Sequence, residues 1–126
     1  MSIVLDAGAL LAVERGDRAM VALLKRERRE NRAPVTHAGV IGQVWRGGHG
    51  RQAHLARLLP GVEVHAVDDE LGRQAGVLLG HAGGADVIDA AVVLLAHDGD
   101  EIYTFDPTDL RHLGEVAGRH VELIPV

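Results

Sequence analysis

The chain has 126 residues, of which 47% are hydrophobic and 25% are charged, and it contains no cysteine. This balance argues against a disordered chain, and the absence of cysteine excludes disulfides, a thiolate nucleophile and a cysteine-bound metal site. The formal net charge of −5 with neutral histidines excludes a global basic field, so any contact with nucleic-acid phosphate must be local or mediated by a cation.

The length predicts one domain that covers residues 1–126 and is large enough to bury a proper core. That core must be aliphatic, because the only aromatic residues are Trp45, Tyr103 and Phe105. No stretch approaches the ~18 uncharged apolar residues of a membrane helix, and Asp6 interrupts the N-terminal apolar run too early for a signal peptide. We therefore expect a cytoplasmic protein without a membrane segment.

The first half of the chain predicts two short strands and four helices from the spacing of its apolar residues. In chain order they are a strand at 3–5, helices at 7–14 and 17–30, a strand at 34–35, and helices at 36–46 and 51–59. Asp17 and Thr36 are the expected N-caps of the second and third helices. The third helix carries an apolar stripe that includes Trp45, and a glycine-rich turn at 47–50 stops it.

The second half continues the alternation of strands and helices. The expected elements are a strand at 62–64, a helix from Asp68 or Asp69 to Gly83, the most apolar helix at 86–97, a strand at 101–105, a helix at 107–116 and a strand at 121–124. Strands that alternate with helices form a parallel sheet covered on both faces, so the predicted fold class is α/β, a three-layer α/β/α sandwich. Ligands of such sheets bind at the carboxyl ends of the strands.

Acidic side chains follow two of the predicted strands. Asp6 ends the first strand, Asp106 ends the fourth, and Asp89 lies in the first turn of the most apolar helix, three residues after Asp86. Gln43 lies inside the predicted third helix. Each acid also has a local explanation, because aspartate is a common N-cap and is stabilised at a helix N-terminus by the helix dipole.

Taken together, these acids indicate a convergent carboxylate cluster. Like charges that are packed together raise one another's pKa and destabilise the fold unless a cation neutralises them. Ligand sets made of oxygen atoms alone favour Mg²⁺ or Mn²⁺ over zinc or copper. The sequence therefore predicts a Mg²⁺ or Mn²⁺ site at this edge of the sheet.

Four stretches of the chain resemble the motifs of PIN-domain ribonucleases, in that family's order and roughly its spacing. They lie at residues 3–7 (IVLDA), 43–47 (QVWRG), 89–93 (DAAVV) and 103–107 (YTFDP). Within the family, the chain is most similar to the VapC-like toxin of a VapBC-type, or type II, toxin–antitoxin system. The resemblance implies a PIN-like central parallel sheet of about five strands, with the first and fourth adjacent. It also implies Mg²⁺- or Mn²⁺-dependent hydrolysis of RNA phosphodiester bonds by an activated water.

The resemblance also implies the roles of individual residues. Asp6, Asp89 and Asp106 would hold the metal ion, and the hydroxyl of Thr104 would support the site. Asp86 and Asp109 are nearby acids without an assigned role. The alternative for Asp109 is that it only completes a capping pair with Asp106.

Gln43 departs from the family pattern, which has glutamate at this position. An amide oxygen can ligate a cation or hold a water molecule but brings no negative charge, so the site should bind Mg²⁺ more weakly. Two hypotheses follow. The protein is an endoribonuclease whose activity Gln43 reduces, or it is a catalytically silent PIN domain that acts by binding RNA or an antitoxin.

The partners implied by the resemblance are an RNA substrate, a cognate antitoxin whose C-terminal segment enters the acidic groove, and a second copy of the chain in a homodimer. The dimer face is expected on the first two helices or on the Val40–Trp45 helix. Around the glycine-rich turn, Arg46, His49 and Arg51 either contact substrate phosphate or an acidic partner segment, or are solvated loop charge. The basic run at residues 25–32 is expected to be a solvated helix end, with RNA contact as the alternative.

Overall fold

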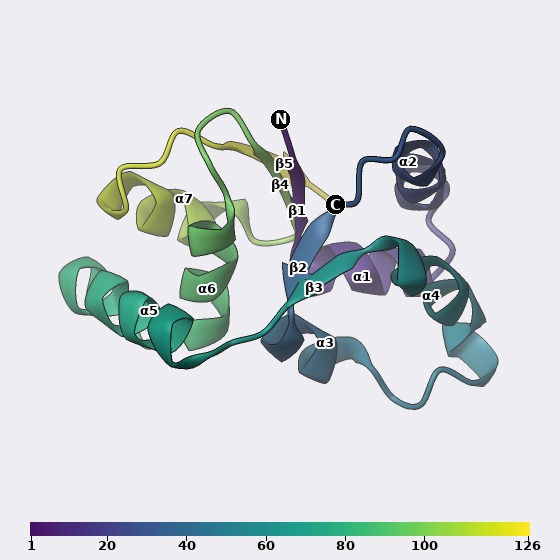
Figure 1. Ribbon diagram of the computed structural model, residues 1–126, viewed down its shortest axis with the longest axis horizontal. Coiled ribbons are helices and arrows are strands. Elements are labelled where there is room, and N and C mark those ends of the chain that lie inside the picture. Colours follow the sequence, from purple (N-terminus) through teal and green to yellow (C-terminus); the bar gives the residue numbers. More distant parts are fainter.

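The computed structural model describes residues 1–126 and is organised around a five-stranded sheet (Figure 1). The strands are β1 (Ile3–Leu5), β2 (Val35–His37), β3 (Glu63–His65), β4 (Glu101–Thr104) and β5 (Glu122–Pro125). Their order in the sheet is β3-β2-β1-β4-β5, and every neighbouring pair runs parallel. The predicted parallel sheet of about five strands, with the first and fourth adjacent, is therefore confirmed.

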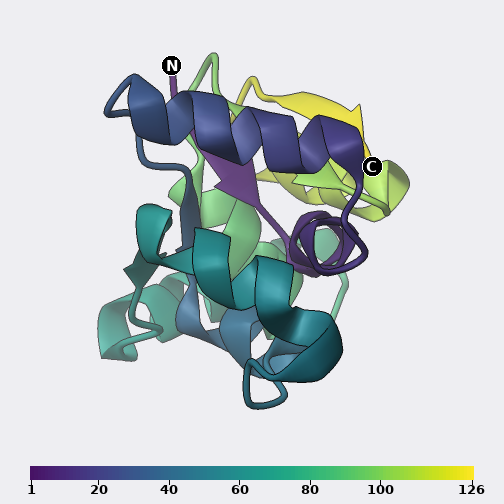
Figure 2. The ribbon, with the colours of Figure 1, turned by 90° about the vertical axis from the view of Figure 1, so that its right-hand side faces the viewer.

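Helices cover both faces of this sheet. They are α1 (Ala7–Glu14), α2 (Arg18–Arg29), α3 (Ala38–Val44), α4 (Ala53–Leu58), α5 (Asp69–Ala82), α6 (Val87–Leu95) and α7 (Pro107–Val116), with 3₁₀ turns at Gly50–Gln52 and Leu59–Gly61 on either side of α4. Figure 1 shows α5, α6 and α7 on one side of the sheet and α1, α2 and α4 on the other. In Figure 2 the second of these layers faces the viewer. This arrangement confirms the predicted three-layer α/β/α sandwich.

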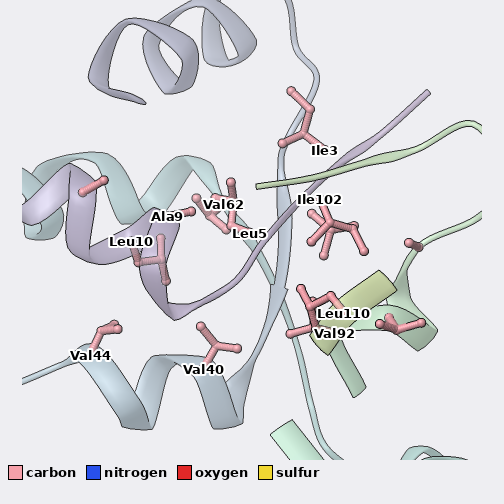
Figure 3. Close-up of a cluster of buried hydrophobic side chains, with 14 of the residues drawn as sticks. Ile3, Leu5, Ala9, Leu10, Val40, Val44, Val62, Val92, Ile102 and Leu110 are labelled. Carbon is pink, nitrogen blue, oxygen red and sulfur yellow. The ribbon is translucent and has the colours of Figure 1, made fainter. Parts of the chain in front are cut away.

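The buried core is one cluster of 25 residues that contains no aromatic side chain. The central strands contribute most directly, since the residues of β1 and Ile102 of β4 are almost fully buried, whereas the edge strand β3 is exposed. Central strands of a parallel sheet are covered on both faces and so need apolar side chains at successive positions. Figure 3 shows Leu5 and Ile102 between side chains of both helix layers, such as Leu10 and Val92. The predicted aliphatic core is confirmed.

The junction of β2 and α3 differs from the prediction. The strand predicted at 34–35 extends to His37, because its residues pair with β3. Thr36 therefore does not cap α3, and its buried hydroxyl instead donates a 2.7 Å hydrogen bond to the carbonyl of Leu5. His37 is the N-cap, and its Nδ1 accepts a 3.0 Å hydrogen bond from the amide of Gly39.

Helix α3 is also shorter than the predicted helix at 36–46. It ends at Val44, and the extended backbone of Trp45 takes the ring out of the apolar stripe, so that Trp45 is 37% exposed. The physical reason is the side chain of Gln52, which donates to the Val44 carbonyl and accepts from the Arg46 amide. The other predicted elements agree with the structure to within one or two residues at each end.

None of the helices is by itself both long enough and apolar enough to cross a membrane. Helices α5 and α6 meet those criteria only as a pair, and this pair is bent by 107° at its break. Residues 90–93 of α6 are buried in the core, as predicted for the most apolar helix.

Candidate functional site

The pairing of β1 with β4 places Asp6 beside the end of β4. Leu5 lies opposite Tyr103 in the register, and the amide of Asp6 donates a 3.2 Å hydrogen bond to the Tyr103 carbonyl. Thr104 and Asp106 follow directly at the end of β4. Because the carboxyl ends of parallel strands meet at one edge of the sheet, the two strand-ending aspartates approach each other there.

Asp6 is the N-cap of α1 and is almost fully buried, with 6% exposed. Its Oδ1 accepts a 3.2 Å hydrogen bond from the amide of Ala9. Burial is the main cause that raises the pKa of Asp6, and the charge of Asp106 adds to it. The Thr104 hydroxyl and the Ala9 and Gly8 amides lower that pKa, because they stabilise the ionised form. The local explanation as a helix cap is correct, but capping does not remove the cost of burying the charge.

Two aspartates lie one turn apart at the N-terminus of α6. Asp86 is the N-cap, and its carboxylate accepts a 3.0 Å hydrogen bond from the amide of Asp89. Burial, followed by the charges of Asp86, Asp6, Asp106 and Asp109, raises the pKa of Asp89 from 3.8 to about 6. Ionisation of Asp89 at neutral pH is therefore opposed by its burial and by the repulsion of its neighbours.

Asp106 precedes Pro107 at the start of α7, as predicted, but its carboxylate makes no capping hydrogen bond. Its backbone amide donates a 2.9 Å hydrogen bond to Oγ1 of the fully buried Thr104. A hydrogen bond with Asp106, followed by the charge of Asp106, raises the pKa of the exposed Asp109. The alternative of a capping pair between Asp106 and Asp109 is wrong, because the Asp106 carboxylate caps no amide and the Asp106 amide bonds Thr104 instead of Asp109.

One small cavity, of about 190 Å³, is lined by the three predicted metal ligands together with Gln43 and Asp86. Its polar side chains belong to Asp6, Gln43, Asp86, Asp89 and Asp106. Phe105 forms part of the wall, and no lysine, arginine or histidine lines the cavity. A second cavity of about 290 Å³ shares Asp86 and Asp89 with the first and includes Asp109. We call the first of these the acidic cavity.

Three helices begin at the acidic cavity, since the N-caps of α1, α6 and α7 are Asp6, Asp86 and Asp106. The partial positive charge of a helix N-terminus stabilises nearby anions, which explains how this fold tolerates the clustered acids. The donors are all oxygen atoms and repel one another, so their chemistry fits a hard divalent cation. No three acidic or histidine side chains are yet close enough to share one ion, and binding would require these carboxylates to converge.

Gln43 reaches the acidic cavity from α3. The wall contributed by α3 is therefore neutral, whereas α6 and the ends of β1 and β4 contribute carboxylates. A glutamate here would add one more negative charge to a site in which the pKa of Asp89 is already raised. The residue that departs from the motifs that the chain resembles thus lies at the cavity itself.

The basic residues of the glycine-rich turn are not brought to the acidic cavity. Arg46, His49 and Arg51 are exposed and lie outside its lining. The Arg46 guanidinium turns back and donates from Nη1 to the carbonyls of Gly42, at 3.2 Å, and Trp45, at 2.7 Å.

Two residues of this region have no role in the sequence prediction. Gln52 is buried, with 2% exposed, and holds the turn after α3 through three hydrogen bonds at 2.8 to 3.0 Å. A fourth, at 2.6 Å, joins it to Glu14 of α1. Phe105 lies in the cavity wall and is 63% exposed. The scarcity of aromatic residues was the one signal that could have pointed to Phe105, because an aliphatic core does not require an aromatic side chain.

The fold and the site together define a PIN-like α/β sandwich with acidic side chains at the carboxyl ends of its central strands. No protein-family model matches the sequence, and no curated protein matches it either. Among solved structures, the fold is similar to that of a chain in the crystal structure of VapBC2 from Rickettsia felis bound to a DNA fragment from their promoter, with a TM-score of 0.69. The likeness covers 98% of both chains at 12% sequence identity, so it shows the shared fold.

Proposed function

We propose that the protein is a Mg²⁺- or Mn²⁺-dependent endoribonuclease that acts in the cytoplasm as the toxin of a toxin–antitoxin pair. The observation that carries the proposal is that Asp6, Asp89 and Asp106 line one cavity, where burial, followed by the charges of the neighbouring acids, raises the pKa of Asp89 to about 6. The full-length likeness to a chain of a VapBC complex supports the toxin role.

In this proposal Asp6, Asp89 and Asp106 hold the cation, and Thr104 keeps Asp106 against the end of β4 through the 2.9 Å bond to its amide. A bound divalent cation supplies an activated water at neutral pH and stabilises the charge that builds on phosphate. Gln43 contributes an amide that can hold a water or a substrate hydroxyl. No side-chain nucleophile is required, in keeping with a chain that has no cysteine.

The partners belong to the same proposal. The similar structure is a VapBC2 assembly bound to promoter DNA, and we infer that this chain likewise pairs with an antitoxin and contributes to a complex that binds its promoter. The acidic cavity has no cation of its own, so a basic side chain of the antitoxin would complement it. A homodimer of the chain completes this arrangement.

A catalytically silent domain is the second candidate, and Gln43 is the observation in its favour. With one carboxylate fewer, the site could bind RNA or an antitoxin without cutting RNA. The two candidates differ in the effect of restoring that carboxylate.

The test is to incubate the purified protein with RNA and either Mg²⁺ or Mn²⁺, beside the Asp6→Asn and Gln43→Glu variants. Asp69→Asn is the matched control, because Asp69 is an exposed aspartate on α5 that pairs with Arg73 at 3.0 Å. Cleavage by the natural chain that Asp6→Asn abolishes and Asp69→Asn preserves supports the enzyme. Cleavage only by Gln43→Glu supports the silent domain. No cleavage by any variant with either metal contradicts nuclease function.

A further inference from the structure

Phe105 is the aromatic side chain that the fold leaves most open. It is 63% exposed, although the chain has only three aromatic residues and an apolar ring gains from burial. It stands between Thr104 and Asp106 and forms part of the wall of the acidic cavity. Aromatic side chains are enriched where proteins contact their ligands and partners, and a ring at the rim of this cavity is placed to contact whatever the cavity receives.

The ring is held in place on one side. It lies against Gly8 in the first turn of α1, where a Cβ would overlap Cδ1 of the ring and come within 2.9 Å of Cε1. The backbone on either side is fixed, because the Asp106 amide is bonded to the Thr104 hydroxyl and Pro107 restricts the residue before it. The ring therefore has one side packed on a glycine and the rest open to solvent, which is the form of a rigid platform.

The negative charge of the site limits the kinds of contact that can add affinity for RNA. No basic side chain lines the acidic cavity, and the chain carries a net charge of −5. Nucleic-acid affinity normally depends on basic residues that neutralise phosphates. Where these are lacking, contact with phosphate depends on the bound cation, and stacking of a base on an aromatic ring is a further attraction that involves no charge.

We infer that Phe105 is a stacking platform for one nucleobase of single-stranded RNA, next to the phosphate that the acidic cavity would receive. This inference rests on the proposed function and adds a substrate subsite to it. Every base offers a flat face, so the subsite accepts any base and does not specify a sequence by hydrogen bonds. Duplex RNA keeps its bases paired and stacked on each other, so single-stranded segments are the substrates that can use this platform.

The first arm of the test measures binding without cleavage. Fluorescence anisotropy with a labelled mixed-sequence RNA of about 12 nucleotides would compare variants made in the Asp6→Asn background. Phe105→Ala and Phe105→Leu should each weaken binding roughly tenfold, whereas Phe105→Trp should retain it. Val77→Ala is the control, because Val77 is 61% exposed on α5 and lies outside the acidic cavity. Equal binding by the phenylalanine and leucine proteins would overturn the inference, since leucine retains apolar bulk without a flat ring.

The second arm separates stacking from a general effect on the fold. A set of RNA probes would each lack one base, at a different position in each probe. At one position, the missing base should weaken binding to the protein with Phe105. The same probe should bind Phe105→Ala as tightly as intact RNA does. The absence of any such position overturns the inference. So does a Phe105→Ala variant that changes the oligomeric state in sedimentation while RNA affinity is unchanged, because the ring would then cover protein.

Failure of the subsite and failure of the proposed nuclease give different results. Phe105-dependent RNA binding without cleavage in Mg²⁺ or Mn²⁺ supports the platform and contradicts the enzyme. Cleavage with kcat and KM unaffected by Phe105→Ala supports the enzyme and contradicts the platform. Cleavage in which Phe105→Ala and Phe105→Leu raise KM, with Phe105→Trp close to the natural chain, supports both.

Discussion

The backbone amide of Asp89 donates a 3.0 Å hydrogen bond to the carboxylate of Asp86, so that one aspartate caps the helix that presents the other. The same closeness makes Asp86 the first of the charges that raise the pKa of Asp89 to about 6. Asp86 therefore both orders the start of α6 and adds to the cost of ionising Asp89, of which burial is the largest part. A cation that neutralised the cavity would offset this cost and keep the cap.

This cost predicts how stability depends on pH in the absence of metal. The pKa of Asp89 is higher in the folded chain than its ordinary value of 3.8, so between about pH 4 and pH 6 the folded state binds more protons than the unfolded state. The free energy of unfolding should fall as pH rises through this window and stay reduced above it. Asp89→Asn should be more stable than the natural chain at neutral pH, by about 1–2 kcal/mol after allowance for solvent screening.

Urea unfolding with a chelator present, at about pH 4.5 and about pH 7.5, would measure this difference. Asp69→Asn should change little at either pH, since Asp69 is exposed. A natural chain that gained stability from pH 4.5 to 7.5, with Asp89→Asn less stable at both, would contradict the prediction.

Divalent cations should stabilise the natural chain. A ligand that binds only the folded state adds about 2.7 kcal/mol at a concentration 100 times its dissociation constant. We expect Mg²⁺ or Mn²⁺ to raise Tm at neutral pH, and to raise it less near pH 5, where Asp89 is largely protonated. Thermal unfolding with NaCl of matched ionic strength provides the control. No added shift from either metal beyond that of NaCl would count against a cation site.

Gln43→Glu should have opposite effects on the metal-free and metal-bound protein. A new carboxylate beside Asp6 and Asp89 adds repulsion and lowers the metal-free stability, whereas it should tighten Mg²⁺ binding roughly tenfold, because affinity depends on the number of charged ligands. Titration calorimetry and chelated unfolding measure the two effects. Gln74→Glu on α5, an exposed position beside Glu70, is the control for the affinity, and it should leave Mg²⁺ binding unchanged. Unchanged affinity in Gln43→Glu would place Gln43 outside the cation's surroundings.

Gln52→Leu should destabilise the fold by about 2–4 kcal/mol, because it leaves buried and partly buried backbone groups without partners. Those groups include the amides of Arg46 and Gly48 and the carbonyl of Val44. Gln74→Leu, in an exposed part of α5, should cost less than about 0.5 kcal/mol. Urea unfolding of both variants decides the matter, and equal stabilities would show that water satisfies the turn in place of Gln52.

Gly8→Ala tests the packing of the Phe105 ring against Gly8. The added methyl overlaps the ring and must displace it, while alanine favours a helix interior by up to about 1 kcal/mol relative to glycine. We therefore expect little loss of stability but weaker RNA binding. That loss should vanish when Phe105→Ala is already present, because there is no longer a ring to displace. A loss of the same size in both backgrounds would indicate an effect of Gly8 on Asp6 instead.

The positions of most strands, helices and helix caps could be predicted from the sequence, because they depend on residues that are close together in the chain. Asp6 follows Ile3–Leu5 immediately, and a carboxylate at the end of an aliphatic strand lies at the sheet edge whatever surrounds it. Asp17, Asp68 and Asp86 cap helices through amides three residues later, so their sequence neighbours suffice to predict them. The order of alternating strands and helices likewise determines a covered parallel sheet.

The features that could not be predicted depend on contacts between segments that are distant in the sequence. Thr36 lost its expected capping role because its hydroxyl bonds Leu5, 31 positions earlier, and α3 ended early because Gln52 took over the backbone groups of the following turn. The sequence by itself determined which acids stand at strand ends and helix starts, since those depend on neighbours a few residues away. Only the tertiary structure decided that Asp6, Gln43, Asp89 and Asp106 share one cavity with an open phenylalanine ring, because that requires the sheet to bring their separate segments together.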